Sequence, residues 1–310
     1  LRDKLLGACA LKDGRSCFVE DGGTILVTRD GTGFEPLDMP GIPQVFRFTA
    51  LFQHSSGDLW VGTIGGGAFR LPANGAPTVR YDIPAGLGSE TVFCFGADAR
   101  QRTWVGTLDG GLSCIDGDEV RTFDPRNGLH TSFVRCIGRD REGNLLIGTN
   151  DNGLDIFKGE RFVSFGEPDG LADPRVWAVL EDRQGSTWFG TDNGIVVLGR
   201  KGSVDRTITV QDGQLTSNFI RSLKEDQNGR IWIGTDNGGL LQYDPRSGRA
   251  VPQTELSFTL AEQKVTALEL GQPGELWVGG LNGVRRYVPG SGTVPTIYTV
   301  NEGLASDHVK

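Results

Sequence analysis

Basic and aromatic residues recur around the start of one apolar segment that the sequence repeats. Two copies of this segment read Val134-Arg135-Cys136-Ile137 and Ile220-Arg221-Ser222-Leu223. Guanidinium and ammonium groups bind anions through charge-assisted hydrogen bonds, and aromatic rings offer a flat apolar surface to a ligand. We therefore predict a site for an anionic or sugar-like ligand, such as a small molecule or an oligosaccharide. Its candidate residues are Arg47, Phe93, Arg135, Arg175, Trp177, Phe219, Arg221 and Lys264.

The same cations also have a purely structural interpretation. Lys and Arg side chains can lie along apolar surface with the charge in water, or they can pair with neighbouring carboxylates. The chain has 39 acidic and 31 basic side chains and a net charge of −8, so acidic partners are plentiful. The sequence leaves both interpretations open.

The segments that carry these residues belong to a long internal repeat. Six copies of a hairpin with a Trp-Val-Gly-Thr-like strand place their glycine at positions 62, 106, 148, 190, 234 and 279, in steps of 42 to 45 residues. A divergent first copy, with Val19 in place of the glycine, raises the number to seven. A repeat of this period made of short strands is typical of propeller blades. We predict an all-β fold, a seven-bladed β-propeller of four-stranded antiparallel blades, forming one domain over residues 1–310. Residues 303–310 resemble the start of an eighth repeat.

Two recurring residue types indicate how the blades pack. The third position of the repeated segment is always small, which predicts that this strand is innermost, where the blades converge and space is short. Cys94 and Cys136 occupy this position, so we interpret them as small apolar residues. The tryptophans are expected to be core residues between adjacent blades: Trp60, Trp104, Trp188, Trp232 and Trp277.

Cys9 and Cys17 lie symmetrically about the short turn Lys12-Asp13-Gly14. A three-residue hairpin loop would place them opposite each other on paired strands. A cross-strand disulfide is sterically possible in that arrangement and would need an oxidising compartment. We keep it as a hypothesis.

Several function classes are disfavoured by composition. The acidic balance disfavours nucleic acid as a partner, and no apolar run approaches the roughly 18 residues of a membrane span. The five cysteines show no C-x-x-C spacing, and no catalytic, metal or cofactor motif stands out.

Of the three histidines, His54, His130 and His308, two fall in inter-blade segments, where no acidic partner is expected nearby. The chain begins without Met and without a signal peptide, so we expect it to be a mature or excised fragment.

The complete pattern resembles the two-component regulator propeller repeat, whose consensus has Gly-Leu, then V-x-x-I-x-x-D-x-x-G-x-L-W-I-G-T, then Gly-Gly-Leu. Residues 220–240 match this consensus nearly throughout, and the resemblance spans about residues 5–310. The first repeat departs from it, and Gly280 stands where Thr is usual.

The resemblance implies a non-catalytic sensor propeller in the periplasmic or other extracytoplasmic part of a bacterial signalling receptor. It also implies that the full-length protein carries a kinase or cyclase output, and that a second propeller or a homodimer partner adjoins this one. The alternatives are a propeller hydrolase or lyase that acts on a carbohydrate-like substrate, since streptogramin lyases share a similar repeat, and a protein-binding scaffold.

Overall fold

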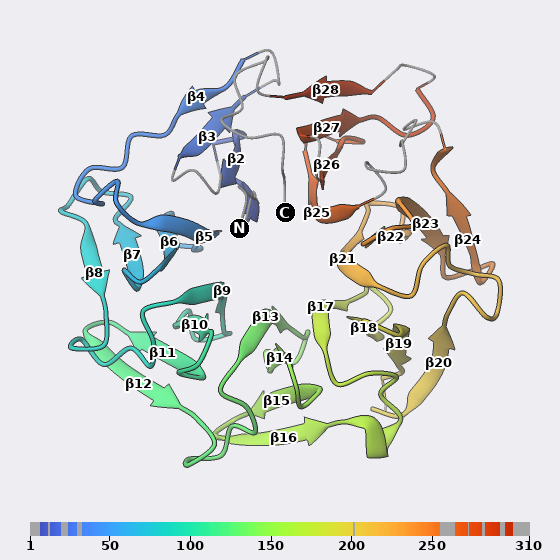
Figure 1. Cartoon of the computed structure of the whole chain (residues 1–310), viewed down its shortest axis with the longest axis horizontal. Helices are drawn as coiled ribbons and strands as arrows, with labels where there is room; N and C mark the ends of the chain where they lie inside the picture. The colour runs from blue at the N-terminus through green and yellow to red at the C-terminus, as the bar shows by residue number, and fades with distance from the viewer. Residues whose placement is uncertain are drawn as a thin grey trace.

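A computed structural model of the chain describes residues 7–11, 13–19, 24–29, 33–200, 202–254, 264–271, 273–280, 283–291 and 295–299. Its strands form seven antiparallel sheets, each made of four strands that are consecutive in the chain. Figure 1 shows these sheets arranged around a central axis like the blades of a propeller, with one strand of each sheet nearest the axis. The predicted all-β, seven-bladed propeller is confirmed. The predicted eighth copy at 303–310 lies outside the described residues.

The two inner strands of each blade carry the repeated segment and the tryptophan motif. The innermost strands, which pack against one another around the ring, are β1 (Gly7–Ala10), β5 (Arg47–Gln53), β9 (Val92–Ala97), β13 (Val134–Arg139), β17 (Val176–Glu181), β21 (Ile220–Glu225) and β25 (Val265–Leu270). The second strands are β2 (Ser16–Val19), β6 (Leu59–Ile64), β10 (Thr103–Thr107), β14 (Leu145–Thr149), β18 (Thr187–Thr191), β22 (Ile231–Thr235) and β26 (Leu276–Gly280).

The two outer strands complete each blade. The third strands are β3 (Ile25–Thr28), β7 (Ala68–Leu71), β11 (Leu112–Asp116), β15 (Leu154–Lys158), β19 (Gly194–Leu198), β23 (Leu240–Asp244) and β27 (Gly283–Tyr287). The outermost strands are β4 (Glu35–Pro36), β8 (Val79–Tyr81), β12 (Glu119–Phe123), β16 (Arg161–Phe165), β20 (Val204–Ile208), β24 (Arg249–Pro252) and β28 (Thr296–Tyr298). One 3-10 helix, η1 (Glu167–Asp169), lies between blades 4 and 5.

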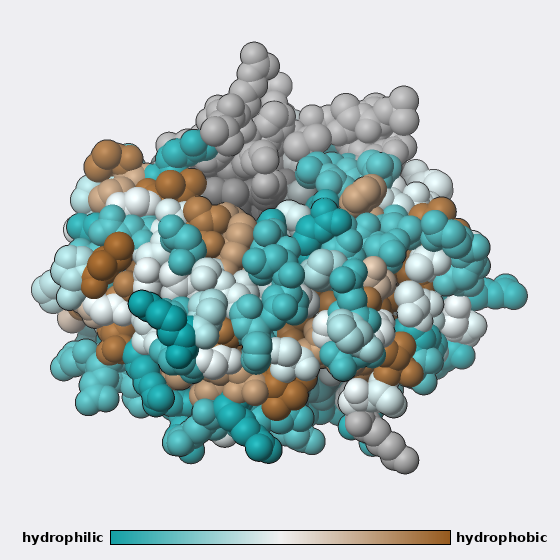
Figure 2. Space-filling model, turned by 60° about the horizontal axis from the view of Figure 1, so that its bottom comes forward, coloured by the Kyte–Doolittle hydropathy of each residue, from teal (hydrophilic) through white to brown (hydrophobic). Residues whose placement is uncertain are grey.

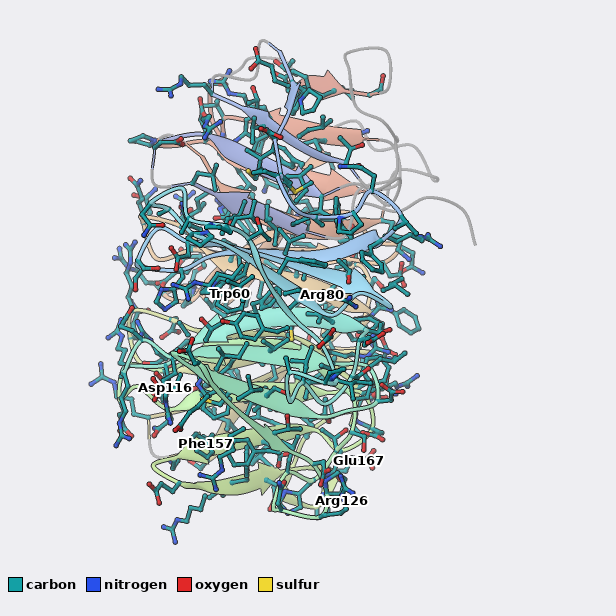
Figure 3. All side chains as sticks on the ribbon, turned by 90° about the vertical axis from the view of Figure 1, so that its left-hand side faces the viewer. Trp60, Arg80, Asp116, Arg126, Phe157 and Glu167 are labelled. Carbon is teal, nitrogen blue, oxygen red and sulfur yellow. The ribbon has the colours of Figure 1, made fainter. Side chains whose placement is uncertain are left out.

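The two faces of the ring differ in what they carry. Figure 3 views the ring from its rim, with Asp116, at the end of β11, toward one face and Arg126 and Glu167, in the crossovers between blades, toward the other. Each inner strand follows a crossover, so the inner strands begin at this second face, which we call the mouth face. The outermost strands carry exposed apolar side chains such as Val79, Val163 and Val251. Figure 2 shows apolar residues scattered among hydrophilic ones on the side that it presents.

The tryptophans lie between blades, as predicted. All five are at most 4% exposed. The ring centroid of Trp104 in blade 3 is 5.0 Å from that of Phe157 in blade 4, and the centroid of Trp188 in blade 5 is 5.3 Å from that of Tyr243 in blade 6. Aromatic pairs at such separations add to the free energy gained from burial. The tryptophans therefore hold neighbouring blades together.

The small residues of the inner strands face the glycine of the second strand. A Cβ atom added at Gly148 would lie 2.4 Å from Sγ of Cys136 and 2.9 Å from Cγ1 of Val176 in the next blade. A Cβ added at Gly106 would likewise lie 2.4 Å from Sγ of Cys94. The backbone therefore approaches the next blade more closely than any side chain would allow.

Blades 1 and 7 close the ring without exchanging a strand, since each contains four consecutive strands. Their contact is aromatic: the centroid of Phe18 lies 5.4 Å from that of Trp277, and the centroid of Phe34 lies 5.0 Å from that of Tyr298. Side-chain packing therefore joins the two ends of the described chain.

The strand register places Cys9 of β1 opposite Cys17 of β2, as the symmetric turn suggested. The structure does not describe the side chain of Cys9, so the disulfide remains a hypothesis.

Candidate functional site

Four of the eight predicted site residues occupy one special position, a β-bulge at the start of the inner strand. In six blades the pairing between the first and second strands shifts there, so that one residue of the inner strand has no partner opposite it. A bulge redirects the side chain of the extra residue and is frequent at functional sites. The six bulge residues are Thr49, Phe93, Arg135, Trp177, Arg221 and Thr266.

The turn after the second strand brings a further side chain to the same face. In blade 6, Oγ1 of the buried Thr235 donates to the carbonyl of Gly239 (2.9 Å) and accepts the N–H of Gly238 (2.8 Å). The turn therefore spans four residues between β22 and β23, and its positive φ lies at Gly239. Its first residue, Asp236, lies beside the bulge. The equivalent residues are Asn150 in blade 4 and Asp192 in blade 5.

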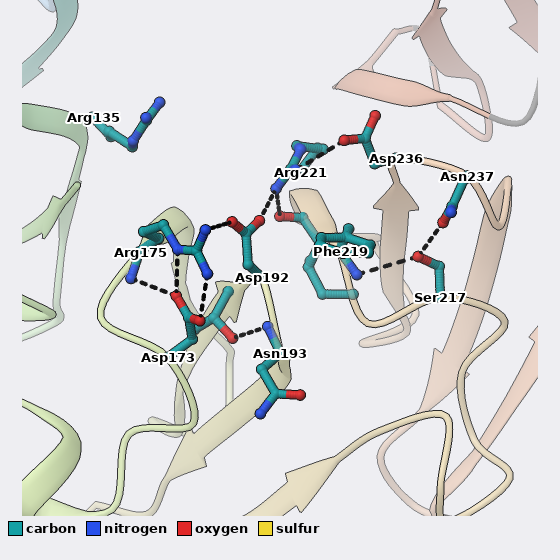
Figure 4. A network of polar contacts seen from close by, with 12 residues as sticks. Arg135, Asp173, Arg175, Asp192, Asn193, Ser217, Phe219, Arg221, Asp236 and Asn237 are labelled. Carbon is teal, nitrogen blue, oxygen red and sulfur yellow. Dashed lines mark hydrogen bonds and ion pairs between the residues drawn. The ribbon is translucent and has the colours of Figure 1, made fainter. Parts of the chain in front are cut away.

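Arg175 and Arg221 share one buried carboxylate, that of Asp192 (Figure 4). Its two oxygens lie 3.0 Å from a guanidinium nitrogen of Arg175 and 2.6 Å from one of Arg221. Arg175 also pairs with Asp173 at 2.8 Å, and its hydrogen bonds and charge lower the pKa of Asp173 below the ordinary value. These two arginines follow the structural interpretation, in which basic side chains pair with acidic neighbours.

Asp236 connects blade 6 to blade 7. It accepts from Arg221 at 2.8 Å and contacts the ammonium group of Lys264 at 2.5 Å. Burial alone would raise the pKa of Asp236, but the hydrogen bond from Lys264 and the charge of Arg221 outweigh it, so the pKa lies below its ordinary value. Asp236 therefore stays ionised at neutral pH and compensates Lys264.

Arg135 differs from the other three cations. Its guanidinium lies 3.7 Å from the ring centroid of Trp177 and 4.6 Å from that of Phe133, and its Nε donates to the amide oxygen of Asn150 at 2.8 Å. No carboxylate within the described ranges pairs with it. Burial, followed by the positive charge of Arg221, lowers the pKa of Arg135 from its ordinary value. Arg135 is therefore a stacked, half-buried cation whose hydrogen-bond partner is neutral.

Trp177 lies at the centre of this arrangement. The guanidinium of Arg221 lies 4.1 Å from its ring centroid, so two arginines contact one indole. Nε1 of Trp177 is buried and has no hydrogen-bond partner among the described residues. Buried polar groups normally have a partner. An acceptor supplied from outside the chain would satisfy this one.

In blades 2 and 3 the mouth face carries apolar side chains. Phe93 packs edge-on against Phe133, with centroids 5.0 Å apart, and Ile64 and Leu108, the first residues of their turns, are 44% and 38% exposed. Phe219, in blade 6, is 43% exposed. Arg47 begins β5 in blade 2, across the ring from β21 (Figure 1).

We use the name mouth cluster for the residues that the structure brings together around Trp177. They are Arg135, Asn150, Asp173, Arg175, Trp177, Asp192, Arg221, Asp236 and Lys264. Five of the eight predicted residues belong to it, Phe93 and Phe219 border it, and Arg47 lies across the ring. The predictions missed Asp173 and also Asn150, Asp192 and Asp236, although each of these last three directly follows the Gly-Thr pair of its repeat.

One expectation about the histidines is wrong. His130 does have an acidic partner: its Nδ1 lies 2.9 Å from Oδ1 of the fully buried Asp155, and its backbone N–H donates to Oδ2 at 3.0 Å. Oγ of Ser164 lies 2.6 Å from the same Nδ1. In a Ser-His-Asp triad the serine and the aspartate contact different ring nitrogens, so this arrangement is not a triad.

Within the part of the chain that the structure describes, no three His, Cys, Asp or Glu side chains are arranged to hold a metal ion. The same residues include no helix with the length and apolarity of a membrane span.

The model of the two-component regulator propeller family matches residues 128–151, 170–193 and 214–237. The chain carries two-component regulator propeller repeats. The three matched repeats contain every member of the mouth cluster except Lys264. No curated protein sequence matches the chain.

Solved structures similar to this chain show its fold. The extracellular domain of a hybrid two component system from B. thetaiotaomicron has a TM-score of 0.69 at 17% identity, covering 98% of this chain and 48% of that one. The extracellular domain of a one component system from B. thetaiotaomicron has a TM-score of 0.53 at 18% identity, covering 95% and 48%. Virginiamycin B lyase from Staphylococcus aureus has a TM-score of 0.72 at 12% identity, covering 89% and 91%. The chain thus spans about half the length of the two extracellular domains.

Proposed function

We propose that this propeller is a non-catalytic, ligand-binding segment in the extracytoplasmic part of a bacterial signalling receptor. Its ligand is a small molecule or an oligosaccharide that carries an anionic group, and it binds at the mouth cluster. The family and the similar extracellular domains support the receptor context. The length of those domains leaves room for a second propeller beside this one, with a homodimer partner as the alternative.

The proposal rests on Arg135, the cation of the mouth cluster that pairs with no carboxylate among the described residues. Four cations and three carboxylates meet in the mouth cluster, and the carboxylates pair with Arg175, Arg221 and Lys264. Arg135 is held in place by stacking and by Asn150, so a ligand anion would gain charge-assisted hydrogen bonds without first breaking an ion pair. A partly desolvated cation–π contact of this kind contributes on the order of 1–2 kcal/mol. Arg135 is therefore preorganised for an anion.

The neighbouring surface suits the rest of such a ligand. Phe93 and Phe133 lie on the blade 3 side of Arg135, and Leu108 adds exposed apolar surface. A sugar ring has an apolar face that packs on aromatic side chains, while its acidic substituent would point toward Arg135. We therefore expect acidic saccharides to bind more tightly than neutral ones.

Calorimetric titration of a uronic-acid disaccharide tests the proposal, with cellobiose as the neutral counterpart. Arg135→Ala should weaken binding of the acidic sugar by about tenfold or more, since a charge-assisted hydrogen bond contributes about 1.5–3 kcal/mol. Arg161→Ala, which removes an exposed arginine from the outer strand of the same blade, should leave affinity unchanged. Equal affinity for both sugars, or for wild type and Arg135→Ala, would refute the site.

The lyase alternative is tested in the same samples. A binding protein returns its ligand unchanged, whereas a lyase or hydrolase converts it. Mass spectrometry of the disaccharide after prolonged incubation should show the starting mass alone. Appearance of a cleaved product would replace the sensor proposal by an enzymatic one.

A further inference from the structure

Blade 4, like blade 1 with Cys17, lacks the tryptophan that fills the space between neighbouring blades in the other five. At the position of Trp104, Trp188 and Trp232, its second strand β14 carries Leu146. The facing residue on the third strand of the next blade is Leu198, where blades 6 and 7 have Tyr243 and Tyr287. The interface between blades 4 and 5 therefore lacks the two aromatic rings that occupy the equivalent positions between blades 5 and 6 and between blades 6 and 7.

The loss coincides with a wide groove at the face opposite the mouth cluster, beyond the end of β13. The groove between blades 4 and 5 has a volume of about 410 Å³, and Leu146 lies in its lining. The equivalent grooves have their tryptophan in place: the one beside Trp232 measures about 150 Å³, and the one beside Trp277 about 170 Å³. Sites for small ligands have volumes of roughly 300–1,000 Å³. Of these three equivalent grooves, the one without tryptophan reaches that size.

The floor and one wall of this groove retain features that hold an indole in other blades. Leu146, Phe189 and Leu198 form a buried apolar floor. Asp140 lines the groove at the position of Asp98 and Asp182. Those two carboxylates accept the indole N–H of Trp104 and Trp188, at 3.1 and 2.8 Å.

In blade 4 the side-chain amide of Asn144 donates to Oδ2 of Asp140 instead, at 2.7 Å. A carboxylate has about four lone-pair sites, so Asp140 can still accept a ligand donor. The groove thus offers an aromatic ring both an apolar floor and a hydrogen-bond acceptor.

The rim of the groove carries charges of both signs, with Glu142 and Glu181 among the basic residues that line it. Lys158 and Arg200 are exposed and line it, and neither has a carboxylate partner among the residues that the structure describes. Arg200 donates instead to the backbone carbonyl of Gln184. Arg141, also at the rim, is already paired with Glu181, 3.5 Å away. An acidic substituent that points out of the groove would meet Lys158 and Arg200.

We propose that the groove between blades 4 and 5 is a second binding site, for an aromatic ring that carries an N–H donor and an acidic substituent. The ring takes the place of the absent tryptophan, the donor binds Asp140, and the acid lies between Lys158 and Arg200. Indole-3-acetate has this chemistry, and indole lacks only the acid. The site is independent of the mouth cluster, which lies at the other end of the inner strands.

Titration calorimetry with indole-3-acetate and with indole tests the proposal. Wild type should bind both, with indole-3-acetate the tighter. Leu146→Trp, which supplies the ring from the chain, should weaken both by about tenfold or more. Arg200→Glu should weaken indole-3-acetate by a similar factor and leave indole unchanged, because it alters only the rim.

One control separates this groove from the equivalent ones. Arg230→Glu changes the rim beside Trp232, and it should bind indole-3-acetate as wild type does. No binding of either probe to wild type at millimolar concentration, or equal binding by Leu146→Trp, would overturn the proposal. If Leu146→Trp fails to fold, unchanged affinity of Arg200→Glu for indole-3-acetate overturns it.

Discussion

At the bulge of six inner strands the side chain varies among Thr, Phe, Arg and Trp, while its neighbours stay apolar or small. In blade 4 the fully buried Val134 precedes Arg135, and Cys136 follows it in the slot against Gly148. Both neighbours are constrained by inter-blade packing, where changes in volume are costly. The bulge residue faces no partner across the strand pair, so its identity is available for binding. This explains how one position can be Thr, Phe, Arg or Trp within a single ring.

The buried thiols make a prediction about alkaline pH. Burial raises the pKa of Cys136 to about 12, from an ordinary value of 9.0. As pH rises above 9, the unfolded chain loses this proton while the folded chain keeps it, so the free energy of unfolding falls. By pH 10 the loss from this group should reach about 1 kcal/mol. Below pH 9 it contributes no pH dependence.

Urea unfolding of wild type and Cys136→Ala at pH 7.5, 9 and 10 checks this expectation. The difference in unfolding free energy between the two proteins should shrink as pH rises, because the alanine variant lacks the titrating thiol. A difference that stays constant across the three pH values would contradict the assigned environment of Cys136.

At the scale of elements, the second strand is held close to the next blade by its glycine. The Cβ atom of Gly148→Ala would lie within 3 Å of both Cys136 and Val176. Overpacking of this kind costs about 1–3 kcal/mol. Gly33→Ala is the matched control, since a Cβ there meets no atom within 4 Å. Thermal unfolding should show a lower Tm for Gly148→Ala alone, and equal Tm values would contradict the inter-blade explanation.

The strands could be predicted from the sequence because the same pattern recurs in every repeat. The period places seven inner strands, and small third residues such as Ala50 and Ala178 mark them as innermost. Of the nine residues of the mouth cluster, five were predicted from the sequence. Arg135 and Arg221 stand out by position within the repeat, whereas Asp192 contacts Arg221 of the next blade, 29 residues away.

Contacts across blades depend on how the turns are placed, and a single sequence does not show this placement. The same reason accounts for the missed contact of His130 with Asp155, which are 25 residues apart. In the sequence, Leu146 is an ordinary substitution for the tryptophan of the repeat. Only the structure shows that this substitution coincides with a wide groove.

At the scale of the whole molecule, the ring closes through aromatic packing between its first and last blades. Phe18 is 1% exposed and contacts both Trp277 and Phe34. Phe18→Ala should lower the free energy of unfolding by about 3–5 kcal/mol, the usual range for a buried phenylalanine. Val163→Ala on the exposed outer wall should change it little. Denaturant unfolding checks this pair, and a Phe18→Ala variant as stable as Val163→Ala would contradict closure by these rings.

The whole ring also explains why the mouth cluster lies where it does. Blades 4 to 7 converge at the axis, so side chains from four blades reach one point: Arg135, Trp177, Arg221 and Lys264. A ligand held there contacts several blades at once. In the proposed receptor, ligand binding would alter how the blades pack against a neighbouring domain. This transmission step is part of the sensor proposal.

The most direct test of this account is a crystal structure of the protein with the uronic-acid disaccharide bound. We predict electron density for the sugar at the mouth face, with its carboxylate within hydrogen-bond distance of the Arg135 guanidinium and a ring against Phe93 or Phe133. Density for the sugar elsewhere on the molecule, with Arg135 still bound only to Asn150, would contradict it.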